Sequence, residues 1–318
     1  MSIGFVYAGQ GSQKVGMGQD FYEKYDKFRE TMDNATAAVE SVTEMDVAGL
    51  CFEGPIEKLS QTRYTQPAMV SFAVGVSKLL KDAGINPEYT CGLSLGEYSA
   101  LYAAGVLSEK EVIELVSKRG KYMEEAGKGL DVKMSAVLGM ERETVIECCT
   151  QATNSFKGEK LVSAANFNCP GQIVISGDAK AVDKASELLK EAGAKRIIPL
   201  NVSGPFHTKL MQPAGDALAK EFENVDFKPM NSKVIFNCLG REKADKEKIS
   251  DILVQQVQSS VYLEDSIKYM ADHGVDTIVE IGPGNAISKF VKKTAPEVKV
   301  MSIDTVEDFE NVVKELLA

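Results

Sequence analysis

The sequence predicts an α/β protein built on a parallel sheet, with a smaller sheet-and-helix unit inserted into the chain. Apolar strand patterns alternate with amphipathic helix patterns in both terminal parts of the chain, which is the order that parallel sheets require. Between about residues 132 and 202 the order changes. The 318 residues are 44% hydrophobic and 26% charged, which is enough for one large domain or two modest ones with a substantial core.

The N-terminal part alternates predicted strands and helices. In chain order they are a strand at residues 4–8, helices at 20–44 and 66–83, a strand at 89–93, and helices at 96–104 and 109–126. Glycine-rich turns follow both strands, so strand, turn and helix occur in the order of an α/β unit. A break at Gly127 and Gly129 ends this part.

The middle of the chain has a strand and helix order of its own. Its predicted elements are strands at 135–138, 161–166, 172–176 and 196–202, with helices at 142–152 and 179–191. The order βαββαβ is that of the split, ferredoxin-like unit. Strand patterns at 234–238, 277–281 and 299–303 then alternate with helices again, so the parallel sheet resumes. We expect a catalytic domain of residues 1–130 and 203–318, with an insertion of residues 131–202.

Charge and composition exclude several classes of protein. Lysine and arginine total 36 against 46 acidic residues, and the net charge of −10 disfavours nucleic acid as a partner. The N-terminus lacks the basic start of a signal peptide, and the most apolar window, residues 67–80, is too short to cross a bilayer. The six cysteines form no CxxC pair, so we expect reduced thiols, no metal site, no membrane and a cytoplasmic protein.

Residues 92–96 read Gly-Leu-Ser-Leu-Gly and match the pattern G-x-S-x-G. In this pattern the glycines let the backbone turn sharply from strand to helix, and the turn holds the serine hydroxyl out at the top of the sheet. The segment lies where a predicted strand gives way to a helix, as such a turn requires. Ser94 is therefore the candidate nucleophile. The alternative is a small residue that only fills a tight turn.

A serine hydroxyl needs an adjacent base near neutral pH, and the chain has two histidines. His273 precedes Gly274 at the end of a predicted helix, where a histidine typically interacts with the negative end of the helix dipole. His207 lies in a loop that leaves a strand, and loops on rigid scaffolds often carry catalytic residues. We expect His207 to be the base, with a structural loop histidine as the alternative.

Two polar residues occupy positions where the helical period predicts apolar side chains. Arg119 shares a helix face with Val116 and Met123. Its guanidinium either pairs with a buried carboxylate of this chain or binds a substrate carboxylate in a cleft. Gln256 lies on the inward face of a later helix. Its amide oxygen either accepts the Nδ1 proton of His207 or satisfies a backbone group.

Together with the segment Gly9-Gln10-Gly11-Ser12-Gln13, these residues resemble the malonyl-CoA:acyl carrier protein transacylase family of fatty acid synthesis. The likeness extends over nearly the whole chain. Its motifs occur, in the family's order, at residues 7–13, 92–97, 118–121, 166–172, 204–207 and 280–284. The chain departs from the pattern at Leu93, where many members carry histidine, and at Ala8, where proline is common.

The resemblance implies a large α/β-hydrolase-like domain with a ferredoxin-like insertion and an active site in the cleft between them. In the family, the serine matching Ser94 takes the malonyl group from CoA as an ester. The histidine matching His207 acts as base and then as acid, and the glutamine matching Gln256 orients it. The backbone N–H groups of Leu95 and Gln10 are expected to form the oxyanion hole.

The resemblance also implies contacts with the substrate. Arg119 matches the arginine that holds the malonyl carboxylate, and Met123 lies on the same helix face. Phe206 resembles the bulky residue of malonyl-selective members, whose ring should crowd the α-methyl group of methylmalonyl-CoA. Asn166 and Asn168 match a stretch that contacts CoA or the phosphopantetheine arm. Core packing for Phe206 and turn formation for the two asparagines stay open as alternatives.

The expected function is transfer of the malonyl group from malonyl-CoA to the phosphopantetheine thiol of holo acyl carrier protein. The cycle is ping-pong through a malonyl-serine intermediate and supplies fatty acid chain elongation. No cofactor is expected, and a monomer is the default. Two alternatives stay open: a serine thioesterase or esterase that delivers the acyl group to water, and a carrier-protein-binding module without activity.

Overall fold

Two five-stranded sheets organise the chain, and the computed structural model describes all residues from 1 to 318. The first sheet is parallel throughout, with the strand order β10-β9-β1-β2-β7. In that order its strands span Lys299–Ile303, Thr277–Ile281, Ile3–Tyr7, Tyr89–Gly92 and Lys233–Val234. The predicted α/β class with a parallel sheet is therefore confirmed.

Fourteen α-helices and one short 3₁₀ helix, Lys209–Met211, surround the two sheets. In chain order the α-helices are α1 Gln19–Lys24, α2 Asp26–Thr43, α3 Val47–Glu53, α4 Ile56–Leu59, α5 Thr62–Asp82, α6 Gly96–Ala103, α7 Glu109–Gly127, α8 Arg142–Ser155, α9 Ala179–Glu191, α10 Gln212–Phe222, α11 Ile249–Gln256, α12 Leu263–Asp272, α13 Ala286–Thr294 and α14 Val306–Leu316. None of them combines the length and apolarity that a membrane span needs.

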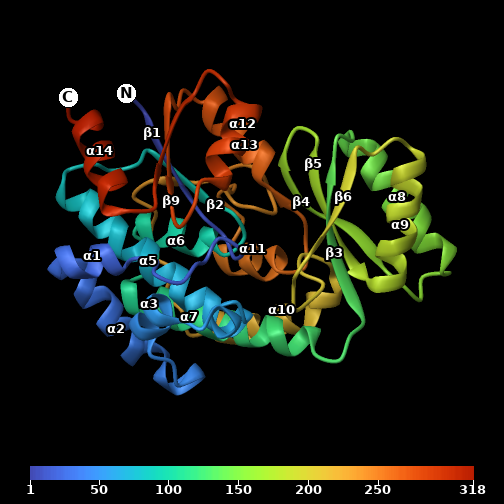
Figure 1. Cartoon of the computed structure of the whole chain (residues 1–318), viewed down its shortest axis with the longest axis horizontal. Coiled ribbons are helices and arrows are strands. Elements are labelled where there is room, and N and C mark those ends of the chain that lie inside the picture. Colours follow the sequence, from blue (N-terminus) through green and yellow to red (C-terminus); the bar gives the residue numbers. More distant parts are fainter.

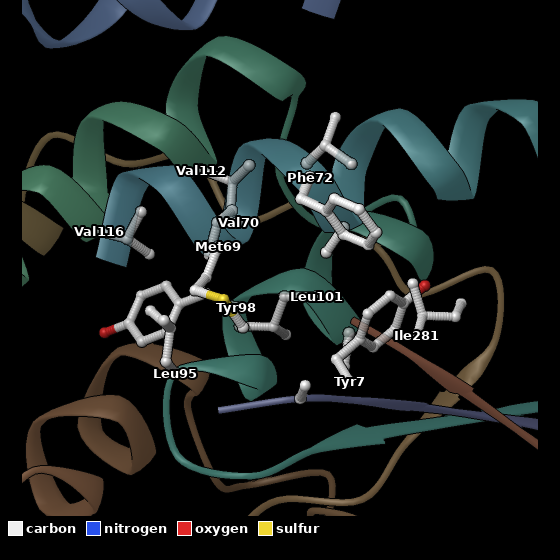
Figure 2. Packing of buried hydrophobic residues seen from close by; sticks show 14 of the residues in the cluster. Tyr7, Met69, Val70, Phe72, Leu95, Tyr98, Leu101, Val112, Val116 and Ile281 are labelled. Carbon is white, nitrogen blue, oxygen red and sulfur yellow. The ribbon is translucent and has the colours of Figure 1, made fainter. Parts of the chain in front are cut away.

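Helices cover both faces of the first sheet, because its central strands are apolar on both sides. Phe5 and Tyr7 of β1 point into the larger core, which includes side chains of α2, α5, α6 and α7. Val6, between them, points into a second core under α12 and α13. Figure 2 shows the larger core around Tyr98 and Leu101 of α6. Helix α6, which directly follows the predicted nucleophile, is therefore packed against the larger core.

The second sheet lies to the side of the first and carries α8 and α9 on its outer face (Figure 1). Its strand order is β6-β3-β5-β4-β8, and the first four strands pair antiparallel. In that order the strands span Arg196–Leu200, Val132–Leu138, Gln172–Asp178, Val162–Cys169 and Val261–Tyr262. Four of them belong to the predicted insertion and have the ferredoxin-like order. Strand β8 comes from outside it and pairs parallel with β4.

Some element boundaries differ from the sequence prediction. The helix predicted over residues 20–44 is divided into α1 and α2, because Tyr25 adopts an extended conformation between them. The strand predicted over 234–238 is shorter, since β7 ends at Val234. Beyond it, a bridge between Phe236 and Arg241 closes a turn. This turn contains Asn237, which contacts the backbone of Ser94.

Candidate active site

Ser94 lies on a sharp turn between β2 and α6, and its backbone φ is 53°. The glycines on either side allow this turn. A Cβ on Gly92 would lie 2.1 Å from the carbonyl carbon of Gly96, and a Cβ on Gly96 would lie 2.2 Å from the carbonyl oxygen of Tyr7. The turn therefore requires glycine at both positions. It holds the backbone of Ser94 in a left-handed conformation that residues other than glycine rarely adopt.

The imidazole of His207 contacts the hydroxyl of Ser94. Its Nε2 lies 2.7 Å from Ser94 Oγ, and its Nδ1 lies 2.9 Å from the backbone carbonyl oxygen of Gln256. A carbonyl oxygen can only accept, so Nδ1 carries the proton and Nε2 is free to accept the proton of the serine hydroxyl. His207 also has a left-handed backbone, with φ 61°. Both members of the pair thus have strained conformations, which occur preferentially at functional sites.

Of the two readings of the Gln256 side chain, the contact with His207 is not observed and the contact with a backbone group is. The amide oxygen does not accept the Nδ1 proton of His207, because the backbone carbonyl of the same residue does. The amide instead lies between two other groups. Its oxygen accepts a hydrogen bond from Arg119 at 2.9 Å, and its nitrogen donates to the carbonyl oxygen of Ser94 at 2.7 Å. Gln256 therefore contacts His207 through its main chain, and Arg119 and Ser94 through its side chain.

Burial sets the protonation state of His207. Desolvation, followed by the positive charge of Arg119, lowers its pKa from 6.5 to about 4, and backbone hydrogen bonds to Gln256 and Ser259 only partly oppose this. The imidazole is therefore neutral over the whole physiological pH range. A neutral imidazole is the form that can take a proton from serine.

The guanidinium of Arg119 is fully buried and lies beside Ser94. It donates to Ser94 Oγ at 3.2 Å, to the amide oxygen of Gln256, and to the amide oxygen of Gln66 at 2.9 Å. It forms no direct salt bridge with a carboxylate of the chain, although the buried acid Glu97 lies close enough for the two charges to interact, and its Nε has no partner. Of the two readings of this residue, pairing with a buried carboxylate of the chain is therefore not observed. A buried cation with neutral partners is well suited to bind an anionic ligand group.

Two residues that line the cleft have backbone N–H groups without a partner in the protein. They are Leu95 and Gln10. Leu95 precedes the first turn of α6, so its N–H lies at the positive end of that helix. The side chain of Gln10 is held by a bond to Thr62 Oγ1 at 3.0 Å. Unpaired N–H donors beside Ser94 are what the oxyanion hole implied by the family resemblance would require.

Ser94 opens into a cleft of about 730 Å³ between the two sheets. Of the predicted contact residues, Met123 comes from α7, Asn166 and Asn168 come from β4, and Phe206 precedes the base. All four line the cleft. Phe206 also packs into the larger core, so its packing and binding readings are compatible. The Oδ1 of Asn168 is buried without a partner, which leaves an acceptor for a ligand.

Sequence reasoning missed three polar residues of the site: Gln66, Glu97 and Asn237. All are fully buried. Glu97 is the only charged residue of α6, which is a signal that could have found it, whereas Gln66 follows the polar residues Arg63 and Thr65 at the start of α5. Burial raises the pKa of Glu97 to about 8, although hydrogen bonding to Asn237 and the charge of Arg119 oppose the shift. Asn237 follows an apolar strand and carries no such signal.

The remaining candidates lie elsewhere. His273 ends α12, where its Nδ1 lies 2.7 Å from the carbonyl oxygen of Tyr269 and its ring stacks on that tyrosine at 3.9 Å. It does not line the cleft. The six cysteines are buried and unpaired, and no three histidine, cysteine or acidic side chains gather as a metal site would require.

Comparisons with known proteins agree with this arrangement. The model of the acyl transferase domain family matches residues 4–310. The malonyl CoA-acyl carrier protein transacylase of Bacillus subtilis (strain 168) is 42% identical over 314 residues, which cover 99% of this chain and 97% of that protein. The chain is therefore an acyl transferase by class. More narrowly, it belongs to the malonyl CoA-acyl carrier protein transacylase family.

Two solved structures extend the comparison. A crystal structure of MCAT from Streptococcus pneumoniae is 41% identical, covers 99% of this chain and 100% of its own, and has a TM-score of 0.92. A type II polyketide acyl-carrier protein in complex with its malonyl-transacylase provides a second match. The matched chain is 32% identical, covers 99% of this chain and 100% of its own, and has a TM-score of 0.91.

Proposed function

We propose that this chain transfers the malonyl group from malonyl-CoA to the phosphopantetheine thiol of holo acyl carrier protein, through an ester on Ser94, and so supplies fatty acid chain elongation. The observation that carries the proposal is the contact of Ser94 Oγ with both a neutral imidazole and a buried guanidinium. The first makes the hydroxyl a nucleophile, and the second provides a partner for the carboxylate that distinguishes malonyl from acetyl.

In the first half of the cycle, Ser94 Oγ attacks the thioester carbonyl carbon and its proton moves to His207 Nε2. The backbone N–H groups of Leu95 and Gln10 stabilise the negative charge on the carbonyl oxygen. The carbon–sulfur bond breaks, and the CoA sulfur leaves with the proton from His207. Malonyl-Ser94 remains, with its carboxylate held by Arg119 and the neighbouring Met123 lining the same end of the cleft.

In the second half the thiol of the carrier protein takes the place of CoA. His207 Nε2 accepts its proton, the sulfur attacks the ester carbonyl, and Ser94 Oγ leaves with that proton. Asn166 and Asn168, on the second-sheet side of the cleft, contact the phosphopantetheine arm in both halves. The absence of an acid behind His207 favours this cycle over hydrolysis, because a serine hydrolase of this kind normally places Asp or Glu there.

Phe206 sets the selectivity of the site. Its ring, directly before the base, leaves little room for a branch at the α-carbon of the acyl group. A single methyl is worth about 1 to 3 kcal/mol in such a pocket, so methylmalonyl-CoA is a poor substrate rather than an excluded one.

The proposal includes the organisation of the chain. Residues 1–130 and 203–318 form the catalytic domain, and residues 131–202 form the inserted domain. Strand β8 belongs to the catalytic domain but pairs with β4 in the sheet of the inserted domain. The chain acts as a monomer in the cytoplasm, where its six free cysteines stay reduced.

The test is transfer from malonyl-, acetyl- and methylmalonyl-CoA to holo acyl carrier protein, with Arg119→Ala beside the unaltered chain. We expect malonyl transfer to be fastest and the substitution to remove the preference for malonyl over acetyl. If Arg119→Ala keeps that preference, the role of the arginine as carboxylate partner is wrong.

A further inference from the structure

Asn237 lies directly behind the nucleophile turn and is fully buried. Its side-chain oxygen accepts a hydrogen bond from the backbone N–H of Ser94 at 2.7 Å. Its side-chain nitrogen donates to the backbone carbonyl oxygen of Gly92, also at 2.7 Å. One amide therefore holds both ends of the turn, on either side of Leu93.

This turn needs to be held in place. Ser94 has a left-handed backbone, a conformation in which the Cβ of a residue other than glycine lies too close to the following carbonyl oxygen. Its N–H lies before the start of α6, outside the hydrogen-bond ladder of the helix, and the carbonyl of Gly92 lies at the end of β2. Asparagine can donate and accept at once, so it satisfies both groups and opposes relaxation of the turn.

Asn237 is itself fixed by its surroundings. Its backbone N–H donates to Oε2 of Glu97 at 2.5 Å, and its carbonyl oxygen accepts from the N–H of Tyr262 at 2.8 Å. Gln256 reaches its side-chain oxygen at 3.5 Å. The short turn after β7 therefore presents the amide from a rigid position, between α6, α11 and the strand β8 of the second sheet.

We propose that Asn237 is a positioning residue for the transfer reaction, which holds the backbone of Ser94 so that its Oγ stays aligned with His207 Nε2. The inference rests on the proposed role of Ser94 as the acylated nucleophile. Asn237 does not touch the cleft and so contributes to the rate of Ser94 acylation without contributing to the binding of malonyl-CoA.

The experiment compares Asn237→Ala, which removes both hydrogen bonds, with Asn237→Asp, which keeps the shape and the acceptor for Ser94 N–H but loses the donor to Gly92. Thr90→Val is the matched control. This substitution removes a buried side-chain hydrogen bond in β2, the strand that ends at Gly92. The bond runs from Thr90 Oγ1 to the carbonyl oxygen of Ala100 and does not involve the Ser94 turn.

Three quantities are measured for each variant. The first is the single-turnover rate of malonyl-Ser94 formation, and the second is the rate at which an alkyl fluorophosphonate modifies Ser94. The third is the Kd of malonyl-CoA, measured in a Ser94→Ala background so that no acylation occurs. We expect both rates to fall by about 100-fold in the two Asn237 variants, which is typical of a small misplacement of a reacting group. The Kd should change less than about twofold, and Thr90→Val should keep both rates.

Rates of the Asn237 variants within about threefold of the unaltered chain would overturn the inference. So would a Kd that weakens as much as the rates fall, because that result indicates general disruption of the site. If Asn237→Ala does not fold, the isosteric Asn237→Asp decides by the same criteria. A different result would contradict the proposed function: the unaltered chain reacts with the fluorophosphonate but forms no malonyl-Ser94. In that case the fluorophosphonate rates of the variants would still decide the role of Asn237.

Discussion

His207 contacts Ser94 as a neutral imidazole, because its ring is buried and lies close to the positive charge of Arg119. Its pKa is depressed to about 4, so lowering the pH through that value, and not through 6.5, should protonate the base and stop the reaction. We expect the rate at which an alkyl fluorophosphonate modifies Ser94 to be flat from pH 8 to about 5 and to fall with a midpoint near 4. In Arg119→Met the midpoint should move up, since the second cause of the shift is removed. A midpoint near 6.5 in the unaltered chain would rule out this account of the base.

Glu97 is a buried acid whose pKa is raised, and stability should depend on pH accordingly. The folded chain holds this proton up to about pH 8, whereas the unfolded chain releases it near 4.5. The unaltered protein therefore loses unfolding free energy as pH rises between these values, by at most about 1.4 kcal/mol per pH unit. Glu97→Gln lacks this loss, so its stability relative to the unaltered chain should increase from pH 5 to 8. Chemical denaturation across this range measures the difference, with the exposed Glu191→Gln as control. A difference that does not vary with pH would contradict the prediction.

At this scale the sequence could indicate residues whose type conflicts with their position or that belong to a motif. Ser94 has the glycine pattern, and Arg119 lies on an apolar helix face. The partner of His207 could not be predicted, because it is a backbone carbonyl, and every residue has one. Asn237 was missed for a related reason: its role comes from a turn that brings residues 92 and 237 together, and no local pattern encodes that approach.

The strand-turn-helix element works only if β2 and α6 approach each other closely. A methyl group on Gly96 would meet the carbonyl oxygen of Tyr7 in the neighbouring strand, and neither backbone can yield without displacing the turn. We expect Gly96→Ala to lower the rate of Ser94 acylation by about 100-fold or more. It should also lower the unfolding free energy by about 1–3 kcal/mol, the usual cost of overpacking.

Gly84→Ala is the matched control for this prediction. Gly84 also has a positive φ, of 80°, but nothing lies within 4 Å of an added Cβ. Gly84→Ala should therefore lower the unfolding free energy only by the strain of a left-handed residue, about 1–2 kcal/mol, and leave the rate of Ser94 acylation unchanged. Full activity of Gly96→Ala would show that the close approach is not needed to place the nucleophile.

Elements with strong local patterns could be predicted from the sequence nearly to the residue. Helix α9 and strands β9 and β10 have the predicted bounds. The helix has a regular apolar period, and each strand is a short run of mostly apolar residues. The predictions were poorer where tertiary contacts decide. Tyr25 interrupts an amphipathic run that reads as one helix, and β7 stops after two residues because the chain turns there to place Asn237 behind the nucleophile.

At the scale of the molecule, the cleft depends on how the second sheet is attached to the first. Arg142 of α8 forms two hydrogen bonds with the carboxylate of Asp265 on α12, at 3.0 and 2.7 Å. Its guanidinium also lies over the ring of Phe167, 4.5 Å from the centroid, and that ring stacks on Tyr262 of β8. This cluster connects the β4 side of the cleft to the helix that follows β8.

Arg142→Met should loosen that connection while leaving the Ser94 turn intact. We expect the KM for malonyl-CoA to rise several-fold, because Asn166 and Asn168 lose their fixed position opposite Ser94. The rate of Ser94 modification by a fluorophosphonate should stay within about twofold. Lys133→Met is the control, since its salt bridge with Asp183 lies within the second-sheet unit. An equal rise in KM for both variants would argue against the attachment as the cause.

The two-sheet plan could be predicted from the sequence because each sheet has its own order of elements. The contribution of β8 to the second sheet could not be predicted, since its two residues lie far from the predicted insertion in the sequence and carry no strand signal of their own. The cleft between the sheets depends on such long-range contacts. For that reason, the sequence alone indicated its residues mainly through the resemblance to a family.

The central claim is that Ser94 carries the malonyl group between two thiols. The most direct measurement is the intact mass of the chain after incubation with malonyl-CoA, followed by addition of holo acyl carrier protein. The account predicts a malonyl adduct on the unaltered chain, no adduct on Ser94→Ala, and loss of the adduct to the carrier thiol when the carrier is added. An adduct that persists in Ser94→Ala, free malonate with no lasting adduct, or an unchanged mass would each contradict it.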